Sequence, residues 1–320
     1  MPSIVTHHIF AKEVKKHLSK SIQAKINDDI FYIFAQSFDN LFYYKFLTPW
    51  QGKAIRELGH LGQQKNVNEY FKNILDYITN NNLEKNQDCL SYLYGSICHY
   101  VLDYHCHPFV IYYTGVPSVN LKYRGLHEKM EVNIDAYMYQ KYAKKELKNA
   151  KLADNLLPKT KFSNQVKNTI DYTFKNTFQK ENMAKIYEKS TRTGNFLVKY
   201  FVTDTTGLKK QLYKIKDCLM KKSPRKYEYL SFYVTKIFPE YLNENHEFWF
   251  YPADKRIKKN DSFLELFEKS LQKACFIIIQ IDEYLKRKIS KKEILTIIGD
   301  NSYTTGLPVS RKLTNKYFKY

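Results

Sequence analysis

Apolar residues recur at helical spacing along almost the whole chain, whereas sustained alternation of apolar and polar residues, which marks β-strands, is hard to find. This pattern predicts an all-α fold. Helices are expected near residues 6–18, 28–36, 51–62, 67–79, 87–107, 123–146, 164–200, 206–221, 225–240, 262–287 and 291–299. Trp249 and its aromatic neighbours are interpreted as core residues.

The breaks between these helices are short. Helix-breaking residues cluster at 48–49, 108, 115–117 and 157–158 without forming a long flexible linker. We therefore predict a single multi-helix domain over residues 1–300. The polar and basic residues 301–320 are expected to form a loosely attached C-terminal tail.

Length and composition narrow the class of protein. With 320 residues, 43% of them apolar and 26% charged, and no apolar run near the roughly 18 residues of a membrane span, the chain is expected to be a soluble globular protein. Its 52 basic and 32 acidic residues give a net charge of +20, which suggests a phosphate-bearing partner. A coding bias towards lysine would produce the same surplus of basic residues, so the charge alone does not establish that the partner carries phosphate.

The cysteines and the N-terminus bear on the compartment. Five scattered cysteines without a C-x-x-C pair indicate neither a disulfide framework nor a thiolate zinc site. The first residues lack the basic and apolar regions of a secretory signal, so a cytoplasmic location is expected. A signal removed from a longer precursor is the alternative.

The histidines are concentrated in one part of the chain, since four of the nine fall between residues 99 and 127. His99, Asp103 and His107 are spaced four residues apart and so share one face of a helix. His127 and Glu131 repeat this spacing on the next predicted helix, with a further carboxylate, Asp135, one turn on. Imidazole and carboxylate pairs at this spacing can chelate one metal ion.

Similar residue pairs also occur on protein surfaces and in di-iron proteins. A single His-x-x-x-carboxylate pair is most often a surface pair worth a few tenths of a kcal/mol. Here the pairs are interleaved with apolar residues, and buried imidazoles and carboxylates need partners, so a metal site is favoured. A ferritin-like di-iron site needs two Glu-x-x-His motifs, and only Glu57 with His60 fits. No motif of a serine hydrolase, a zincin or a nucleotide-binding fold is present.

The order of these residues resembles the zinc-dependent phospholipase C superfamily, which includes single-strand-specific zinc nucleases and the catalytic domain of glycosylphosphatidylinositol phospholipase D. The resemblance is carried by Ser3–His7, by Ser37–Tyr44 with its Asp39, by the helix with His99, Asp103 and His107, and by the final His127 and Glu131 pair. A weaker likeness over residues 241–267 points to uncharacterised cytoplasmic bacterial members. The resemblance implies an all-α fold with up to three zinc ions.

The resemblance also implies which residues hold the ions. One zinc would be held by Asp39, His60, His99 and Asp103, a second by His107, His127 and Glu131, and a third by the Pro2 amine, His7 and Asp103. His60 follows Asp39 by an unusually long interval, so Gln63 or a near neighbour is the alternative there, and His105 competes with His107. Removal of Met1 would leave Pro2 five residues before His7, the spacing found in the nucleases.

The activity implied is hydrolysis of a phosphodiester, most simply at a phospholipid head group. Zinc on such ligands lowers the pKa of bound water to around 7. Asp39 would both ligate a zinc and orient or deprotonate the attacking water. A zinc nuclease or another phosphodiesterase on the same scaffold stays open, as does a non-catalytic helical binding protein stabilised by its metals. No transmembrane segment is expected, although peripheral contact with a membrane stays open. No obligate protein partner is indicated.

Overall fold

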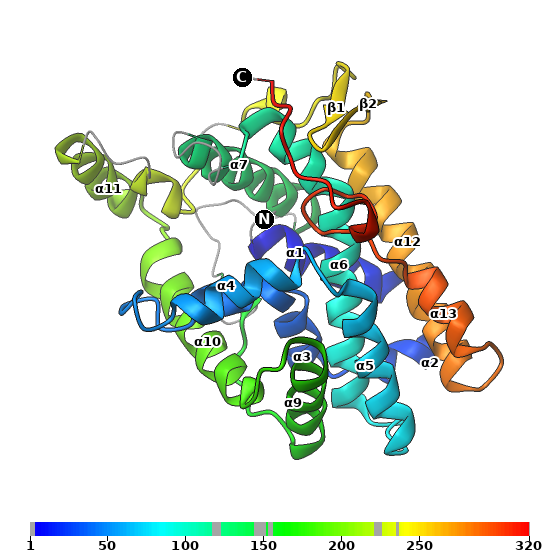
Figure 1. Ribbon diagram of the computed structural model, residues 1–320. Helices are drawn as coiled ribbons and strands as arrows, with labels where there is room; N and C mark the ends of the chain where they lie inside the picture. The colour runs from blue at the N-terminus through cyan, green and yellow to red at the C-terminus, as the bar shows by residue number, and fades with distance from the viewer. Residues whose placement is uncertain are drawn as a thin grey trace.

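The computed structural model describes residues 4–116, 123–143, 152, 156–220, 226–234 and 237–319. This part of the chain is mostly helical, which confirms the all-α class (Figure 1). The α-helices are α1 Ile4–His17, α2 Lys20–Gln23, α3 Asp28–Phe34, α4 Lys53–Gly62, α5 Val67–Asn80, α6 Gln87–Thr114, α7 Tyr123–Ala143, α9 Asn164–Phe178, α10 Met183–Leu197, α11 Leu208–Leu219, α12 Phe263–Leu285 and α13 Lys291–Ile298. Among the described residues, no helix combines the length and apolar character needed to cross a bilayer.

Shorter elements connect these helices. The 3₁₀ turns are η1 Ser37–Tyr43, η4 Tyr227–Leu230, η5 Pro239–Tyr241 and η6 Val309–Arg311, and a π-helical turn, η3 Val198–Val202, extends α10. Strands β1 Trp249–Tyr251 and β2 Asp254–Lys259 pair antiparallel as a small hairpin. The helical periodicity did not predict this hairpin. Trp249 is buried as expected, but its neighbour Phe248 is 60% exposed, so the interpretation as a core residue is wrong there.

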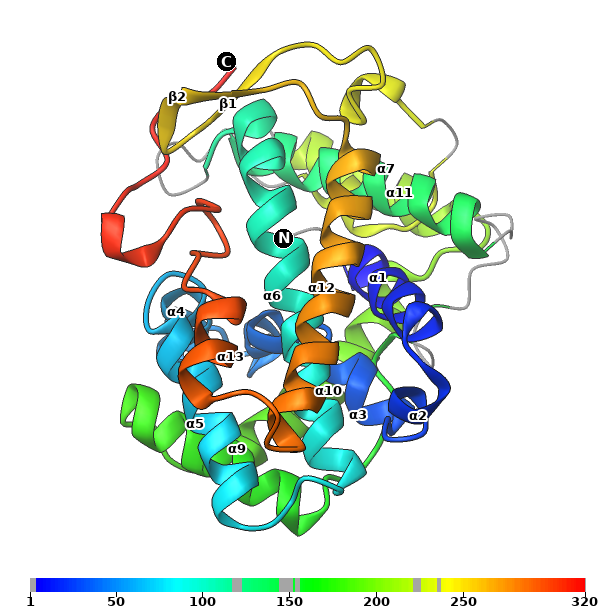
Figure 2. The ribbon, with the colours of Figure 1, turned by 90° about the vertical axis from the view of Figure 1, so that its right-hand side faces the viewer.

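Helix α6 is the centre of the fold. From Cys89 to Ile111 every residue except His105 is buried, because α6 is surrounded by α1, α3, α7, α9 and α12. Figure 2 shows α12 running beside it. A helix that is apolar on all sides is stable only in such a position. At its start, the side chain of Asn86 accepts a hydrogen bond from the N–H of Cys89.

Pro108 was expected to interrupt α6, but the helix continues through it to Thr114. A proline inside a helix leaves the carbonyl four residues earlier, here that of Tyr104, without its usual donor. The C-terminal loop packs closely at this point, since a Cβ added to Gly306 would lie 2.5 Å from the Tyr104 oxygen. The burial of the rest of α6 holds the helix together across the proline.

Two other helical predictions were wrong in detail. The segment 164–200 forms two helices, α9 and α10, because Gln179 and Asn182 between them adopt positive φ angles of 51° and 59°. The segment 225–240 contains the turns η4 and η5 where its described residues form regular structure, rather than one helix.

The C-terminal residues 301–319 pack onto the helices, so the expected loose attachment is wrong. Tyr303 is fully buried, and its N–H donates to the carbonyl of Gln63 at 2.9 Å. Further along, the N–H groups of Lys316 and Lys319 donate to the carbonyls of Pro252 and Tyr112. These backbone hydrogen bonds carry no signature in the side-chain pattern. The domain boundary placed at residue 300 stays a prediction.

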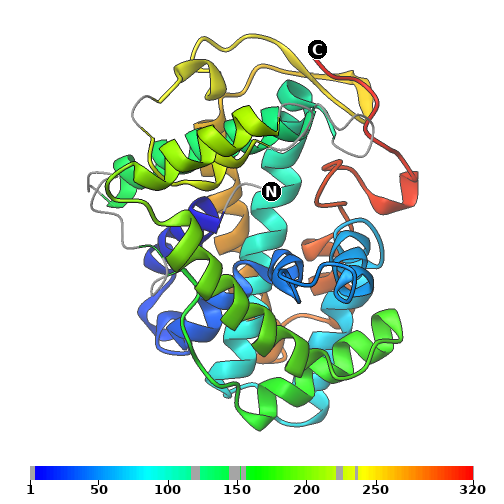
Figure 3. The ribbon, with the colours of Figure 1, turned by 90° about the vertical axis from the view of Figure 1, so that its left-hand side faces the viewer.

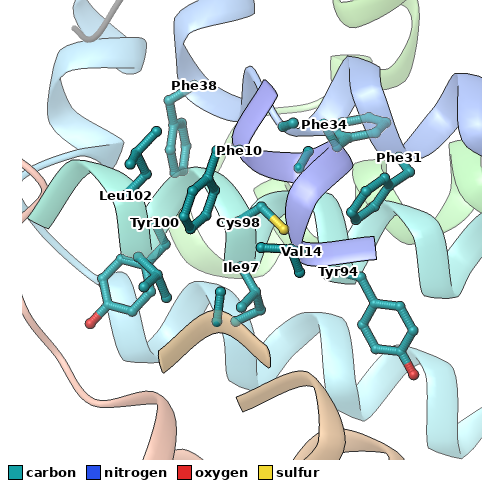
Figure 4. Packing of buried hydrophobic residues seen from close by; sticks show 14 of the residues in the cluster. Phe10, Val14, Phe31, Phe34, Phe38, Tyr94, Ile97, Cys98, Tyr100 and Leu102 are labelled. Atoms are coloured by element: carbon teal, nitrogen blue, oxygen red, sulfur yellow. The ribbon is translucent and has the colours of Figure 1, made fainter. Parts of the chain in front are cut away.

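The core joins the first third of the chain to α6. Phe10 of α1, Phe31 and Phe34 of α3 and Phe38 of η1 point towards the apolar side of α6 (Figure 4). Phe34, for example, meets Tyr92 of α6 edge to face at 4.5 Å between ring centroids. This packing fixes α1 and η1 against the middle of α6, where the polar residues discussed next are buried.

Candidate metal centre

Four polar residues from three elements meet inside the protein. His7 comes from α1, Asp39 from η1, and His99 and Asp103 from successive turns of α6; all four are buried. Each offers one ligand atom within 4.8 Å of the other three. Asp103 lies between the two histidines, with its carboxylate oxygens 3.2 Å from Nε2 of His7 and 3.3 Å from Nε2 of His99.

Helix α7 holds His7 in place from outside the group. The carboxylate of Asp135 accepts hydrogen bonds from the N–H groups of Val5 and Thr6 at 3.2 and 2.9 Å, and from the Thr6 hydroxyl at 2.5 Å. It thus satisfies donors at the first turn of α1, where a negative charge is also favoured by the helix dipole. The Asp135 carboxylate noted in the sequence therefore anchors the helix end that carries His7.

Helix α4 positions Asp39. Gly62 allows the close approach of α4 to η1, because a Cβ at this position would lie 2.2 Å from the ring of Phe38. The next residue, Gln63, is buried, and its Nε2 donates to Oδ1 of Asp39 at 2.5 Å. One oxygen of Asp39 is therefore fixed by an amide, while Oδ2 faces Nε2 of His7 at 4.0 Å.

Several buried atoms of this group make no hydrogen bond: both ring nitrogens of His7, Oδ2 of Asp39, Nε2 of His99 and both oxygens of Asp103. A buried polar group without a partner costs about 1–3 kcal/mol. So many in one place are not tolerable in a purely structural core. A cation bound among them would pair with the carboxylate oxygens, with Nε2 of His99 and with one of the two ring nitrogens of His7, so this donor set fits a metal ion.

The histidines are oriented to present a lone pair to such an ion. Nδ1 of His99 lies 3.2 Å from the carbonyl of Ala35, and Nδ1 of His107 lies 2.9 Å from the carbonyl of Tyr303. A carbonyl only accepts, so each Nδ1 carries the proton and each Nε2 is left as a ligand atom. A hydrogen bond from the non-ligating nitrogen is the usual support of a metal-bound histidine.

The electrostatics agree with this arrangement. Burial lowers the pKa of His7 and of His99 to about 3, so both rings are neutral at physiological pH. Burial also raises the pKa of Asp39 and Asp103, and for Asp39 the neighbouring Asp103 charge adds to the rise. A divalent zinc ion binds neutral imidazoles, and its charge would stabilise two carboxylates whose ionised forms are otherwise disfavoured by burial.

A second set of residues lies further along α6 and on α7. His107 extends the first group, with Nδ1 3.6 Å from an oxygen of Asp103 and a buried Nε2 that makes no hydrogen bond. On α7, which packs on α6, Nε2 of His127 lies 3.0 Å from Oε1 of Glu131. Nδ1 of His127 is paired with the hydroxyl of Thr114 at 2.9 Å.

The structure does not bring every predicted ligand to the centre. His60 is exposed and its ring packs on Phe42 at 4.5 Å, outside the group of four. Gln63, three residues later and directly after α4, takes the place facing Asp39. His105 is half-buried, and its Nδ1 bonds the carbonyl of Val101 in the preceding turn. Pro2 lies outside the described residues.

Sequence reasoning did not find the supporting residues. Tyr303 acts through its backbone carbonyl, which has no signature in the sequence, and it comes 196 residues after His107. Ala35 supports His99 in the same way. The hydroxyl of Thr114 was detectable only as a polar residue near the end of a buried helix.

Comparison with known proteins identifies the family. The sequence matches the family described as zinc dependent phospholipase C over residues 6–180, more than half of the chain and the part that contains His7 and Glu131 with all the residues between them. The chain therefore belongs to this family. Neither a curated protein nor a solved structure shows a significant match to it.

Proposed function

We propose that this member of the zinc dependent phospholipase C family is a phosphodiester hydrolase that acts on a phospholipid head group. The observation that carries the proposal is the buried group of His7, Asp39, His99 and Asp103, whose ligand atoms lie within 4.8 Å of one another. The family supports zinc as the metal and a phosphodiester as the substrate.

Up to three ions are proposed. Asp103 is the natural bridging ligand, since its two carboxylate oxygens lie 3.2 Å from Nε2 of His7 and 3.3 Å from Nε2 of His99. His107 would hold a second ion with the His127 and Glu131 pair of α7. The Pro2 amine would complete a third site with His7 and Asp103. When bound, the zinc ions supply a water of lowered pKa and neutralise charge on the phosphate oxygens.

The chain's own residues would then position the reaction. Gln63 holds Oδ1 of Asp39, so that Oδ2 is left to orient the attacking water and to accept its proton. The carbonyls of Ala35 and Tyr303 keep His99 and His107 in one tautomer and one orientation. These hydrogen bonds orient the three side chains before a metal or substrate binds.

The proposal is tested by substrate turnover in zinc-loaded full-length protein. A soluble phosphocholine diester with a chromogenic leaving group should be hydrolysed, and Asp39→Asn should reduce kcat/KM by about 10²–10⁴-fold, the usual contribution of a general base. The matched control is Asp29→Asn, at an exposed aspartate of α3, which should leave turnover unchanged. Hydrolysis that is indifferent to both substitutions would contradict the role of Asp39.

The metal count is tested separately. Elemental analysis should find about three zinc ions in the untagged protein, and extension of the N-terminus should remove the ion assigned to Pro2. Protein that contains no transition metal would contradict the proposal as a whole.

A zinc nuclease is the second candidate, because the net charge of +20 would concentrate any polyanionic substrate at the surface. Faster turnover of single-stranded DNA than of the phosphocholine ester would favour it. Zinc binding without turnover of either substrate would instead indicate a metal-stabilised binding protein.

A further inference from the structure

Helix α11 turns its apolar side away from the protein. Leu208, Leu212, Ile215 and Leu219 form one stripe along the helix, and their exposed fractions lie between 56% and 82%. In a surface helix of a globular protein such a stripe normally faces the core. Figure 1 shows α11 at the edge of the molecule, at the upper left, away from the central α6.

Hydrogen bonds on the opposite side of α11 hold it in this orientation. Asp217 is buried and accepts the N–H groups of Tyr227 and Glu228 at 2.8 and 3.0 Å. Lys210 Nζ donates to the carbonyl of Tyr233 at 2.7 Å, and the Tyr213 hydroxyl donates to a carbonyl of η3 at 3.1 Å. A rotation that buried the leucines would break all of these bonds, so the exposure of the stripe belongs to the fold.

A second exposed apolar segment lies on the same side of the molecule. In the loop between η1 and α4, Phe46, Leu47 and Trp50 are 39%, 68% and 72% exposed. This loop and α11 both project at the left of Figure 1, and both face the viewer in Figure 3. We define the apolar face as these three loop residues together with the four residues of the α11 stripe. Seven exposed apolar side chains on one side of the molecule favour an interaction site there.

The charges beside the apolar face are positive. Residues 196–220 contain five lysines and two aspartates, and both aspartates, Asp204 and Asp217, are buried and bonded to backbone N–H groups. The loop, residues 44–52, contributes one more lysine, Lys45, and no acidic residue. Lys53 follows at the start of α4, where its Nζ lies 3.7 Å from a carboxylate oxygen of Glu57. Among the described ion pairs, the one carboxylate that meets a lysine of α11 is Glu228, 3.9 Å from Lys214.

We propose that the apolar face is a docking surface for an anionic phospholipid membrane. Leucines and a tryptophan can enter the boundary between head groups and acyl chains while the surrounding lysines contact lipid phosphates. A second copy of this chain is a poorer occupant, because it would bring the same lysines against one another. The docking surface uses no residue of the metal centre. It adds to the proposed function a means of reaching a lipid substrate.

The two tryptophans provide a direct readout. Trp50 is 72% exposed, whereas Trp249 is fully buried in the core. Addition of phosphatidylcholine vesicles that contain phosphatidylglycerol should therefore shift the emission of Trp50 to shorter wavelength, and Trp50→Phe should abolish the shift. Vesicles of pure phosphatidylcholine should bind more weakly, and added salt should weaken binding to the anionic vesicles. Full-length protein that shows no shift and does not co-sediment with anionic vesicles would overturn the proposal.

Substitutions in α11 test the stripe itself. Leu219→Glu and Ile215→Glu should each weaken vesicle binding by about tenfold or more. Both side chains are exposed, so the variants should fold with unchanged Tm. The matched control is Ile279→Glu, at a 40% exposed isoleucine of α12 on the right of Figure 1, which should bind vesicles normally. Equal binding by all three variants would overturn the proposal.

Two further measurements separate the alternatives. Turnover of the soluble phosphocholine diester should be the same in Leu219→Glu and wild type, so failure of docking and failure of the proposed activity are read independently. A dimer that Leu219→Glu dissociates, in protein that does not bind vesicles, would assign the apolar face to self-association and overturn the membrane proposal.

Discussion

The link between α7 and α1 through Asp135 makes a sharp prediction about the metal centre. Replacing Asp135 with alanine removes the acceptor for the N–H groups of Val5 and Thr6 and for the Thr6 hydroxyl. These donors are buried, and His7 is the next residue of α1. The substitution should therefore both destabilise the protein and loosen His7, although Asp135 itself does not belong to the group of four ligands.

The magnitude follows from the three hydrogen bonds. A buried hydrogen bond to a charged group contributes about 1.5–3 kcal/mol, and such terms are not additive within one cluster, so a loss of about 3–5 kcal/mol is expected for Asp135→Ala. For a chain of this size the corresponding fall in Tm is about 10 °C. Loss of a residue that orients a metal ligand typically weakens metal binding by about 10–100-fold.

The assay is thermal unfolding together with zinc titration, and Asp204 provides the matched control. Asp204 is also buried and accepts two backbone N–H groups and one hydroxyl, from Gly207, Lys210 and Ser231, at 2.7–2.9 Å. It lies next to α11, so Asp204→Ala should lower stability without changing zinc affinity. If Asp135→Ala lowers Tm while its zinc affinity equals that of the control, the anchoring of His7 by α7 is wrong.

Three further predictions follow from the same contacts. Stripping the metal with a chelator should lower Tm, because an ion at a thousandfold excess over its Kd stabilises the folded state by about 4 kcal/mol, and an unchanged Tm would argue against a resident metal. Burial raises the pKa of Asp103, so its ionised form destabilises the metal-free fold; Asp103→Asn should raise the Tm of stripped protein at about pH 8. This increase in Tm should vanish near pH 3, where Asp103 is protonated in both states because the pH lies below the unfolded-state pKa of about 3.9. An increase that does not depend on pH would contradict the explanation by burial of the ionised carboxylate. Gly306→Ala should cost about 1–3 kcal/mol in denaturant unfolding, because φ is +68° there and the added Cβ would lie 2.5 Å from the Tyr104 oxygen; a neutral effect would contradict the close packing of the C-terminal loop.

Features that depend on one helix were open to prediction. The all-α class follows from the helical spacing of apolar residues, and the buried position of α6 follows from its apolar character on all sides. The His99 with Asp103 and His127 with Glu131 pairs each share a face, as their four-residue spacing requires, and their heads lie 3.3 and 3.0 Å apart.

Features that depend on contacts between distant segments could not be predicted from the sequence. His60 lies on α4 and Gln63 directly follows it, and only the packing of α4 on η1 decides that Gln63 faces Asp39. The support of His107 by Tyr303 joins segments 196 residues apart through a carbonyl, which every residue possesses. Every residue has the same backbone carbonyl, so the pattern of side chains cannot predict which carbonyl will accept a given hydrogen bond.

The orientation of α11 shows most clearly the difference between what the sequence determines and what the tertiary structure decides. The sequence by itself determined that this helix has an apolar and a polar side, since helical geometry fixes the angle between successive residues. Only the tertiary structure decided which side faces out: buried Asp217 and its backbone partners in η4 hold the polar side inward and leave Leu219 exposed. Spacing along one helix is set by local backbone geometry, whereas the choice of buried face depends on hydrogen bonds and packing that other segments supply.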